Sequence, residues 1–586
     1  MEQANLLQAA QLLLTGFIWS IGLWASMKGF GWALRKTTNL KTPLWTDPVN
    51  GVVLFVVVTG WLDYYHLSTR ITLTLIALAG IALFLVACAT ALQKKQFPKI
   101  GPKEGIVILT ASVIAALGSY HIQYMANWDD VTGYLPVCNE MMISGNSWAP
   151  LSLRRALSWG GQYPLQTLGM LFTSDRGGWI YERAMGTWLL LGFALALSRS
   201  GKGWVYAGIA ILALIAPQTN LNSAPNVLIV LIMLSAWLLR NNPILLGATG
   251  AAMLALRTQC LPFLGLLLLF ITWEQFKKAG WKTALKNACI TGGLILALLT
   301  PFALNHLRQF QTPIILLWPG TIDANYLKFQ ATVLERLDGI WQMTLTTGPL
   351  LLALLLGLEN KKSRTLCICA LIATAIITIT MPEYSATEWR RYSWPAITAA
   401  LLLLSFNWAK TGRSRSAFLA LALSTTYPLR ELDRAGNKIV TELKATGFDW
   451  SEATRAQLTV PEGANLAVLL LQVNGLDFQR NKIFNLDVFP AVGNVPRTPD
   501  PEAWKAWTKS QGIDYLMHLD FQETRGGIKA SDLFIKPSSP VTDLKNYRRV
   551  WFPDRQKIMD CLDKLRTTIP NRKEGAFIIF DFTQNK

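Results

Sequence analysis

Charged residues are scarce in this chain of 586 residues: only 16% are Asp, Glu, Lys or Arg, whereas 51% are hydrophobic. A soluble enzyme of this length needs more charge on its surface, so the balance excludes that class and is typical of a polytopic membrane protein. The four histidines and seven cysteines are scattered without metal-ligand spacing, which gives no support to a His/Cys metal cluster. The C-terminal part also lacks a Gly-rich phosphate loop and a nucleophile elbow.

Net charge does not indicate a nucleic-acid partner. The chain carries 55 basic and 36 acidic residues, a formal charge of +19. After Pro428 basic and acidic residues nearly balance, so most of the excess belongs to the apolar part of the chain. No Lys/Arg run with interleaved aromatic residues follows Pro428, as a basic binding groove would need. We therefore expect no nucleic acid among the partners, and we attribute the charge to membrane topology.

Long apolar runs dominate the first three quarters of the chain. Each is near the length that a helix needs to cross the hydrocarbon core, so we predict an all-α polytopic domain of about 14 transmembrane helices. The predicted spans are 6–27, 49–62, 71–92, 105–125, 184–197, 204–217, 226–239, 243–256, 260–273, 287–304, 347–358, 365–381, 394–408 and 416–427.

Lys and Arg gather in every second loop, and this distribution predicts the orientation of the helices in the membrane. If the N-terminus lies outside, alternate loops hold the basic clusters around Lys28, Lys94, Lys277 and Lys361, which agrees with the positive-inside rule. The loops 126–182, 305–345 and 382–393 and the whole C-terminal part then lie on the outer face. The overall style favours a bacterial inner membrane, with the N-terminus and the C-terminal domain in the periplasm.

Composition changes after Tyr427, where proline and charged residues become frequent. Residues 466–471, 482–486, 515–519 and 577–582 read as buried strands, and 433–446, 501–510 and 555–566 read as helices, which predicts a small α/β domain. We thus divide the chain into N-terminal transmembrane helices (1–104), a transmembrane catalytic domain (105–427) with the outer loop 126–182, and an outer α/β domain (428–586).

The outer loop 126–182 carries the residues most indicative of chemistry. Asp129 and Asp130 follow Trp128 at the end of an apolar helix. Carboxylates near a membrane surface beside aromatic side chains can act as a general base or bind a cation. The alternative is that acids at a helix exit are simply solvated. Residues 132–144 and 149–159 then read as two amphipathic surface helices, the second with Arg154 and Arg155 on its polar side.

This loop resembles the first outer loop of the GT-C superfamily. Both have an acidic motif after a transmembrane helix, then a tyrosine (Tyr134 here), two surface helices and a return to the membrane. The GT-C enzymes are polyprenyl-phosphate-sugar-dependent glycosyltransferases, protein mannosyltransferases and aminoarabinose transferases among them. The resemblance implies that Asp129 or Asp130 is the catalytic base. We also expect Tyr134, Arg154 and Arg155 in this loop to contact substrate.

Three later stretches extend the resemblance over roughly residues 105 to 427. Leu254-Ala255-Leu256-Arg257 ends a Gly/Ala-rich segment and turns back at Pro262, similar to a hairpin that carries a basic residue in these enzymes. The stretch 308–319 resembles a Pro-rich outer segment. The stretch 388–395 contains Arg391-Tyr392-Ser393-Trp394-Pro395, which is similar to an Arg-Tyr-x-x-Pro motif at the mouth of a late helix.

Such an enzyme must stabilise a leaving phosphate, and guanidinium groups bind phosphate with paired hydrogen bonds. We expect the outer-face arginines to bind the phosphate; they are Arg257, Arg308, Arg390 and Arg391. We expect Tyr392, beside Arg391, to contact substrate as well. The alternative for each is an arginine that reaches lipid head groups. The sequence departs from the family pattern at 218–225, a turn without an acid, which argues against metal coordination by a paired acidic motif. Whether a divalent cation takes part stays open.

The sequence therefore predicts an inverting membrane glycosyltransferase that moves a sugar from a polyprenyl-phosphate donor to a lipid, glycan or protein acceptor. Two alternatives stay open. An oligosaccharide ligase or polymerase would use a diphosphate-linked donor at the same surface. A transporter or flippase would show broken helices in two related halves.

Overall fold

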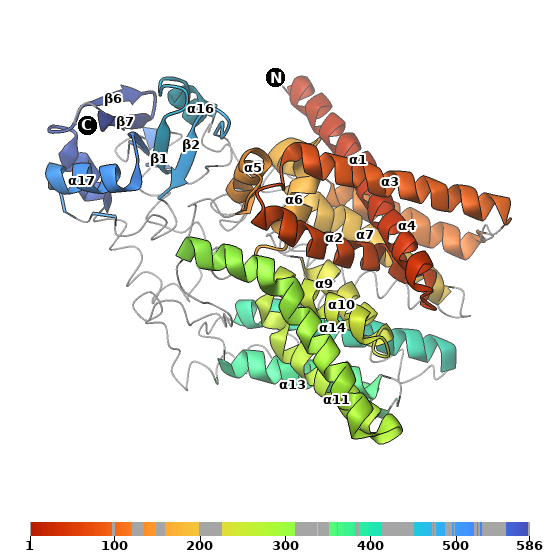
Figure 1. Ribbon diagram of the computed structural model, residues 1–586. Coiled ribbons are helices and arrows are strands. Elements are labelled where there is room, and N and C mark those ends of the chain that lie inside the picture. The colour runs from red at the N-terminus through yellow and green to blue at the C-terminus, as the bar shows by residue number, and fades with distance from the viewer. Residues whose placement is uncertain are drawn as a thin grey trace. The chain divides into compact units, whose positions relative to one another are not determined.

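The chain is mostly helical, with a small sheet near its C-terminus (Figure 1). The computed structural model describes residues 2–95, 100–119, 134–147, 159–198, 225–310, 351–359, 363–380, 386–411, 451–470, 476–486, 498–520 and 558–583, with isolated residues and dipeptides between them. The chain forms two compact units. The first comprises Met1–Gln123 and Ser158–Leu443, and the second Tyr124–Leu157 and Lys444–Lys586.

Four helical segments within the described residues are long and apolar enough to cross a membrane: Leu44–Tyr64, Arg70–Gln93, Gly177–Leu197 and Thr258–Arg308. Shorter apolar helices cover Asn226–Leu238, Pro243–Leu256, Arg364–Thr378 and Ser393–Asn407. The prediction of apolar, membrane-type helices is confirmed at these places. Two of the predicted spans, 204–217 and 416–427, lie outside the described residues.

Three long helices open the first unit: α1 (Glu2–Thr38), α2 (Asp47–Tyr64) after the short η1 (Leu44–Thr46), and α3 (Arg70–Gln93). Glycines let them approach closely. A Cβ on Gly51 would lie 1.8 Å from the Met27 carbonyl oxygen, and one on Gly29 would lie 2.0 Å from the Gly80 carbonyl oxygen. Small residues are what allow helix backbones to meet inside a membrane.

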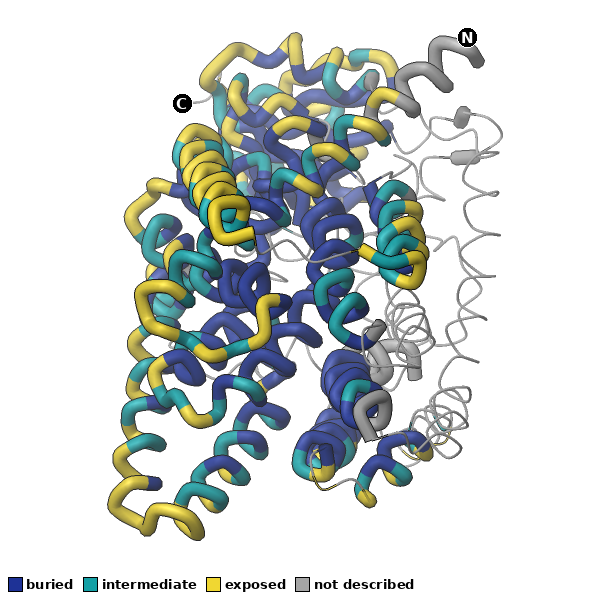
Figure 2. The backbone as a smooth tube through the Cα atoms, turned by 90° about the vertical axis from the view of Figure 1, so that its right-hand side faces the viewer, coloured by how far each residue is buried: buried dark blue, intermediate teal, exposed yellow. Residues whose placement is uncertain are grey.

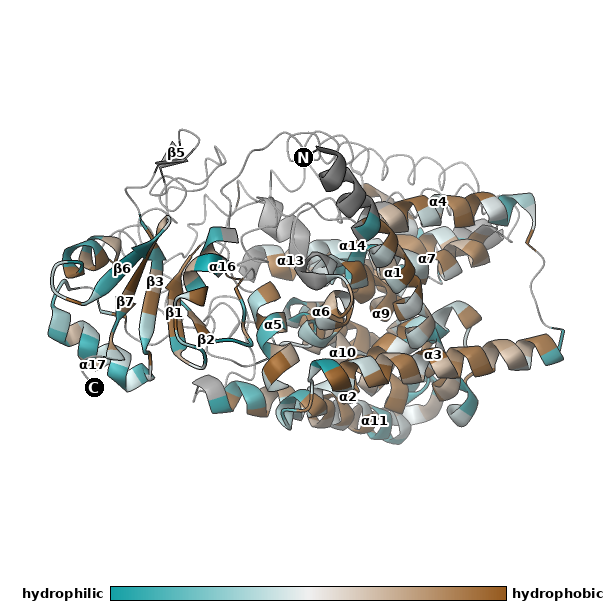
Figure 3. Ribbon diagram, turned by 90° about the horizontal axis from the view of Figure 1, so that it is seen from above, coloured by the Kyte–Doolittle hydropathy of each residue, from teal (hydrophilic) through white to brown (hydrophobic). Residues whose placement is uncertain are grey.

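The outer faces of several helices are apolar and exposed, as Figures 2 and 3 show. On α3, Ile71 is 73% exposed and Leu85 61%. On α4 (Pro102–Gly118) Leu109 is 67% exposed. Exposed apolar side chains along a whole helix are costly in water but favourable against lipid tails, so these faces fit a membrane protein.

The centre of the first unit is formed by α7 (Ile180–Ser198), α9 (Asn226–Leu238) and α10 (Pro243–Leu256). Helix α9 is buried over nearly its whole length. One of its few polar groups, the Ser235 hydroxyl, donates to Asn50 Oδ1 at 2.8 Å. Before α7 lie the short α6 (Tyr163–Met170) and η5 (Ser174–Trp179).

Helix α11 (Leu261–Phe310) contains two antiparallel segments. Its helical pattern is broken at Gly280, which has φ 82° and ψ 167°. The Asn287 amide donates to Gln275 Oε1 at 3.0 Å across this break, and both Leu264 and Ile295 lie beside Gly250. A straight helix would hold those two residues more than about 40 Å apart. The stretches 260–273 and 287–304, predicted as two spans, thus lie in separate helical segments joined by a basic turn.

The last helices of this unit are α13 (Arg364–Thr380) and α14 (Ala386–Thr411), with the short η8 (Gly357–Glu359) before them. The predicted loop 382–393 is wrong over its second part, because residues 386–393 are already helical. Hydropathy located only the apolar part of α14 and missed its polar first two turns.

In the second unit, a five-stranded sheet has the order β2-β1-β3-β7-β6. Its strands are β1 (Asn465–Leu469), β2 (Lys482–Asn485), β3 (Tyr515–Leu519), β6 (Asn571–Glu574) and β7 (Phe577–Asp581). The strand β1 pairs parallel with β2 and β3, whereas β7 pairs antiparallel with β3 and β6. The four predicted strands are confirmed within two residues at each end, and β6 was not predicted.

Helices α5 (Leu135–Ser144), α16 (Ser451–Leu458) and α17 (Pro501–Gln511) belong to the same unit, as does a two-stranded hairpin of β4 (Thr524–Arg525) and β5 (Ile528–Lys529). Residues 558–565 are also helical. Asp500 caps α17 by accepting from the Glu502 N–H at 3.1 Å, and Gly512 ends it with a left-handed conformation. The Pro-Glu start and the Gly end are ordinary helix signals.

We expect the stability of this sheet to depend on pH because of His518 in β3. Its ring is fully buried, stacks on Phe580 and donates from Nδ1 to the Leu519 carbonyl oxygen at 2.8 Å. Burial lowers the pKa of His518 to about 4, from 6.5. The folded sheet therefore favours the neutral ring over the charged one. The contribution of His518 to the free energy of unfolding is fully present above pH 6.5. It is lost as the pH falls from 6.5 toward 4, by about 3 kcal/mol in all.

Hydrogen exchange of peptides that cover β1, β3 and β7, corrected for the intrinsic rate, measures this effect. We expect faster exchange at pH 5 than at pH 7 in the native chain and a much weaker pH dependence in His518→Leu. An equal pH dependence in both proteins would show that another group is responsible.

Candidate functional site

Glu182 lies in the first turn of α7 and is almost fully buried, with 3% of its surface exposed. Its carboxylate accepts hydrogen bonds from the backbone N–H of Val227 and, at 3.3 Å, of Leu228. These donors belong to the first turn of α9, whose N–H groups have no partners within the helix. A carboxylate there is favoured by the helix dipole as well as by hydrogen bonding. Glu182 thus fixes the start of α9 against α7.

Arg257 ends α10 in an extended conformation, with φ −153° and ψ 112°. The chain then turns through η7 (Thr258–Cys260) directly into α11. The Arg257 Nε and one Nη nitrogen are buried, and the guanidinium lies close enough to Glu182 to act on its carboxylate electrostatically. The turn and the helix end therefore hold this positive charge at a defined place in the helical unit.

A second turn lies against the same helix end. The Gly161 N–H donates to the Ala255 carbonyl oxygen at 3.1 Å. A Cβ on Gly161 would lie 2.9 Å from the Ala255 backbone, so only glycine permits this contact. The turn leads into α6, where Gln162, Tyr163 and Gln166 are each at most 1% exposed. Among the described residues, the Gln162 Nε2 has no hydrogen-bond partner.

These pieces form one polar cluster between apolar helices, which we call the Arg257 cluster: Gln162, Glu182 and Arg257 with the Gly161 turn. Helix α14 contacts both η7 and α9. The helix that contains the Arg-Tyr-x-x-Pro stretch therefore packs on η7, which follows Arg257, and on α9, which Glu182 caps. An arginine whose Nε and one Nη nitrogen are buried beside polar neighbours can hold an anion in a membrane-type fold, because a guanidinium offers paired donors in a fixed geometry.

A further polar group lies where α2 meets the second segment of α11. The Asn305 amide donates to Asp63 Oδ2 at 3.0 Å, and both residues are buried, as is His306. Arg308 donates to the Tyr64 carbonyl oxygen at 3.2 Å, and its guanidinium lies 4.1 Å from the centre of the Tyr64 ring. Because the two segments of α11 are antiparallel, Arg308 and Arg257 lie at the same end of that helix pair, opposite the Gly280 turn.

The structure describes some of the predicted site residues in full, others only in their backbone, and others not at all. Arg257 and Arg308 are described in full. Tyr134 is buried at the start of α5, within the second unit. Only the backbone of Arg390, Arg391 and Tyr392, in the first turns of α14, lies in the described part of the chain. Asp129, Asp130, Arg154 and Arg155 lie outside the described residues.

The sequence reasoning missed Glu182 and the Asp63–Asn305 pair. One signal was present for both: an ionisable residue inside an apolar helix of a membrane protein is by default a candidate for function. Glu182 was passed over because the predicted span began at Ala184, after it. No group of three or more His, Cys, Asp or Glu that could hold a metal occurs among the residues that the structure describes.

Comparisons with models of known protein families, with curated proteins and with solved structures give no match to this chain. The function must therefore be argued from the site and from the sequence resemblance.

Proposed function

We propose that this chain is an integral-membrane glycosyltransferase, which takes a sugar from a polyprenyl-phosphate donor and passes it to an acceptor hydroxyl with inversion. The reaction takes place at the outer face of a bacterial-type inner membrane, where the basic inner loops put the outer loop 126–182. The observation that carries the proposal is the placement of Arg257, held at the end of α10 beside the Glu182-capped start of α9.

Arg257 suits a lipid phosphate because its surroundings combine charge with apolar helices. The neighbouring residues of α10 and α9 are buried and apolar. A polyprenyl chain needs an apolar path, and its phosphate needs a fixed cation at the end of that path. A guanidinium offers paired donors to phosphate oxygens and keeps its charge at any physiological pH. Preorganised donors of this kind stabilise charge that develops as a bond breaks.

The reaction needs one base and one phosphate site. Asp129 or Asp130 takes the proton of the acceptor hydroxyl, and the freed oxygen pair attacks the anomeric carbon. The bond from that carbon to the phosphate oxygen breaks, and the phosphate leaves with the bonding pair and one more negative charge. Arg257 faces that charge, with Arg390 and Arg391 as further cations from α14. A single base on the face opposite the phosphate gives inversion.

Substitution of the acids tests the base. In membranes supplied with a radiolabelled polyprenyl-phosphate sugar, Asp129→Asn and Asp130→Asn are compared with the native chain. The variant at the base should lose transfer by about 10²- to 10⁴-fold, as expected for a lost general base. The other variant should keep most of its activity, and both should be expressed at native levels. Full transfer by both variants would remove the acids from the mechanism.

A further inference from the structure

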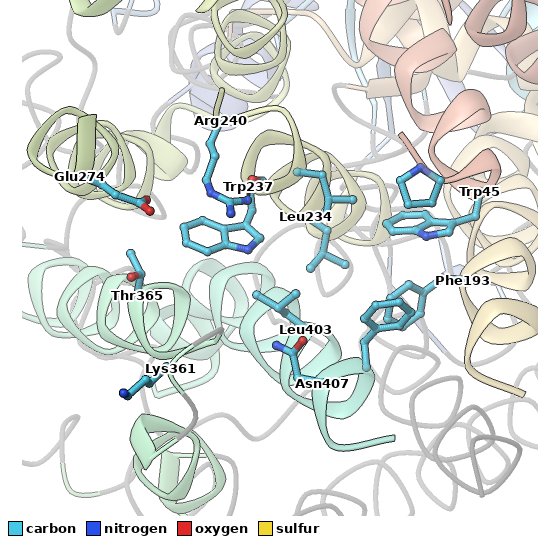
Figure 4. A pocket seen from close by; sticks show the side chains of 13 residues that line it. Trp45, Phe193, Leu234, Trp237, Arg240, Glu274, Lys361, Thr365, Leu403 and Asn407 are labelled. Atoms are coloured by element: carbon cyan, nitrogen blue, oxygen red, sulfur yellow. Dashed lines mark hydrogen bonds between the residues drawn. The ribbon is translucent and has the colours of Figure 1, made fainter. Parts of the chain in front are cut away.

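A cavity of about 440 Å³ opens among helix ends of the first unit, far along the helices from Arg257. Its wall includes Trp45 of η1, Phe193 of α7, Leu234 and Trp237 of α9, and Leu403 of α14 (Figure 4). Its volume lies within the range of pockets that bind small molecules. None of these residues belongs to the Arg257 cluster.

The two ends of this cavity differ in chemistry. Figure 4 shows Trp45 and Phe193 together on one side, with their rings 5.2 Å apart, and Arg240, Glu274 and Thr365 on the other. Leu234 and Leu403 lie between them. The cavity is thus apolar and aromatic at one end and charged at the other, which is the pattern that an amphiphile requires.

Arg240 is fixed at the charged end. It donates from Nη1 to the Trp237 carbonyl oxygen at 2.8 Å, and its guanidinium lies 4.3 Å from the centre of the Trp237 ring. Within the described residues no carboxylate forms an ion pair with Arg240, because the nearest acid of the cavity, Glu274, pairs with Lys278. Lys361, which is exposed, also lines the cavity. The end therefore keeps net positive charge and free guanidinium donors.

The positions of the cavity residues along the helices indicate at which level of the membrane the cavity lies. Arg240 follows the end of α9, Lys361 precedes α13, and Trp45 precedes α2. They share this end of the unit with the Gly280 turn and its lysines, since Gln275 donates to the Arg240 carbonyl oxygen at 3.3 Å. Tryptophans and basic residues at the ends of apolar helices lie at the level of lipid head groups. Basic pockets between such helices on the inner side bind anionic lipid head groups.

We propose that this cavity binds an anionic phospholipid of the inner leaflet. Its phosphate contacts Arg240, with Lys361 also in the lining, and part of one acyl chain lies along Leu234 and Leu403 toward Phe193. This site is separate from the proposed sugar-transfer site and does not depend on that function. A bound lipid would link η1, α7, α9 and α14, whose residues line the cavity.

Native mass spectrometry of the purified full chain in a neutral detergent tests the site, with phosphatidylglycerol, phosphatidylcholine or inorganic phosphate added. We expect phosphatidylglycerol to bind at least about tenfold more tightly than phosphatidylcholine. Arg240→Gln should remove most of that preference. Lys282→Gln is the matched control, since it removes one positive charge from the same end, whereas Lys282 is exposed and does not line the cavity. It should leave binding nearly unchanged.

A second variant tests the apolar part. Leu234→Phe narrows the cavity without a change in charge and should weaken phosphatidylglycerol binding several-fold. Equal binding of the two lipids, or equal losses in Arg240→Gln and Lys282→Gln, would overturn the proposal. Displacement of the lipid by inorganic phosphate at similar concentrations would show a site for free phosphate instead, and would overturn it as well.

Discussion

Arg257→Gln is expected to lower sugar transfer by about 10²- to 10³-fold, which is the usual cost of removing one preorganised donor from a developing negative charge. Glutamine keeps a polar side chain of similar reach but loses the charge and the paired donors. Arg257 lies at a helix end that is fixed by the Gly161–Ala255 hydrogen bond and by η7, so its guanidinium is preorganised. The measurement is transfer of label from a polyprenyl-phosphate sugar in membranes.

Arg70→Gln is the matched control for this substitution. Arg70 starts α3 at the same end of the unit, and its guanidinium donates to the Leu171 carbonyl oxygen at 2.9 Å. The same change of side chain there should alter transfer by less than about threefold, because glutamine still offers an amide donor and Arg70 is not among the proposed phosphate contacts. Equal losses in both variants would mean that Arg257 acts through folding and not on the phosphate.

Gly51→Ala is expected to cause a large loss of stability in the helical unit. The added Cβ would lie 1.8 Å from the Met27 carbonyl oxygen and 2.6 Å from its carbon, both backbone atoms of α1 that cannot rotate away. The helices α1 and α2 must then separate, which costs about 3 kcal/mol or more. That shift would also disturb the Arg35–Asp47 ion pair, at 2.9 Å, beside the same crossing. Thermal unfolding in detergent, followed by size-exclusion chromatography, measures the loss.

Gly293→Ala provides the comparison. Gly293 also lies inside an apolar helix, but a Cβ there would meet no atom within 4 Å. Alanine should leave the unfolding temperature unchanged or raise it slightly, since glycine is the poorer helix former by about 1 kcal/mol. If both variants lose equal stability, the cause is the glycine-to-alanine change itself and not the close crossing of α1 and α2.

Apolar periodicity located the helices and strands wherever burial alone decides structure. Helix α3 differs by one residue at each end from its predicted span, and the predicted strand 515–519 coincides with β3. Both are apolar runs that end at polar residues. Helix α1 instead continues to Thr38, well past Lys28, and α14 begins at Ala386, before its apolar part. Hydropathy measures the length that lipid can cover, whereas a helix continues as long as its backbone hydrogen bonds do.

The features that the sequence did not predict depend on contacts between residues far apart in the chain, which a local sequence pattern does not show. Strand β6 is polar and largely exposed, and it exists because its backbone pairs with β7. Its residues, Asn571–Glu574, have low strand propensity. The contact of Glu182 with the first turn of α9 joins residues 45 positions apart. The sequence did single out Arg257 as a site residue, and its neighbour Glu182 became evident only once α7, α9 and α10 were brought together.

Donor specificity tests the central claim most directly. Membranes that contain the native chain are supplied, in parallel, with a radiolabelled polyprenyl-phosphate sugar and with a radiolabelled sugar on polyprenyl diphosphate, and the label is followed into the acceptor fraction. We predict transfer from the monophosphate donor, with release of polyprenyl phosphate, and none above background from the diphosphate. Transfer from the diphosphate alone, or movement of the intact lipid across the bilayer without sugar transfer, would contradict the proposed function.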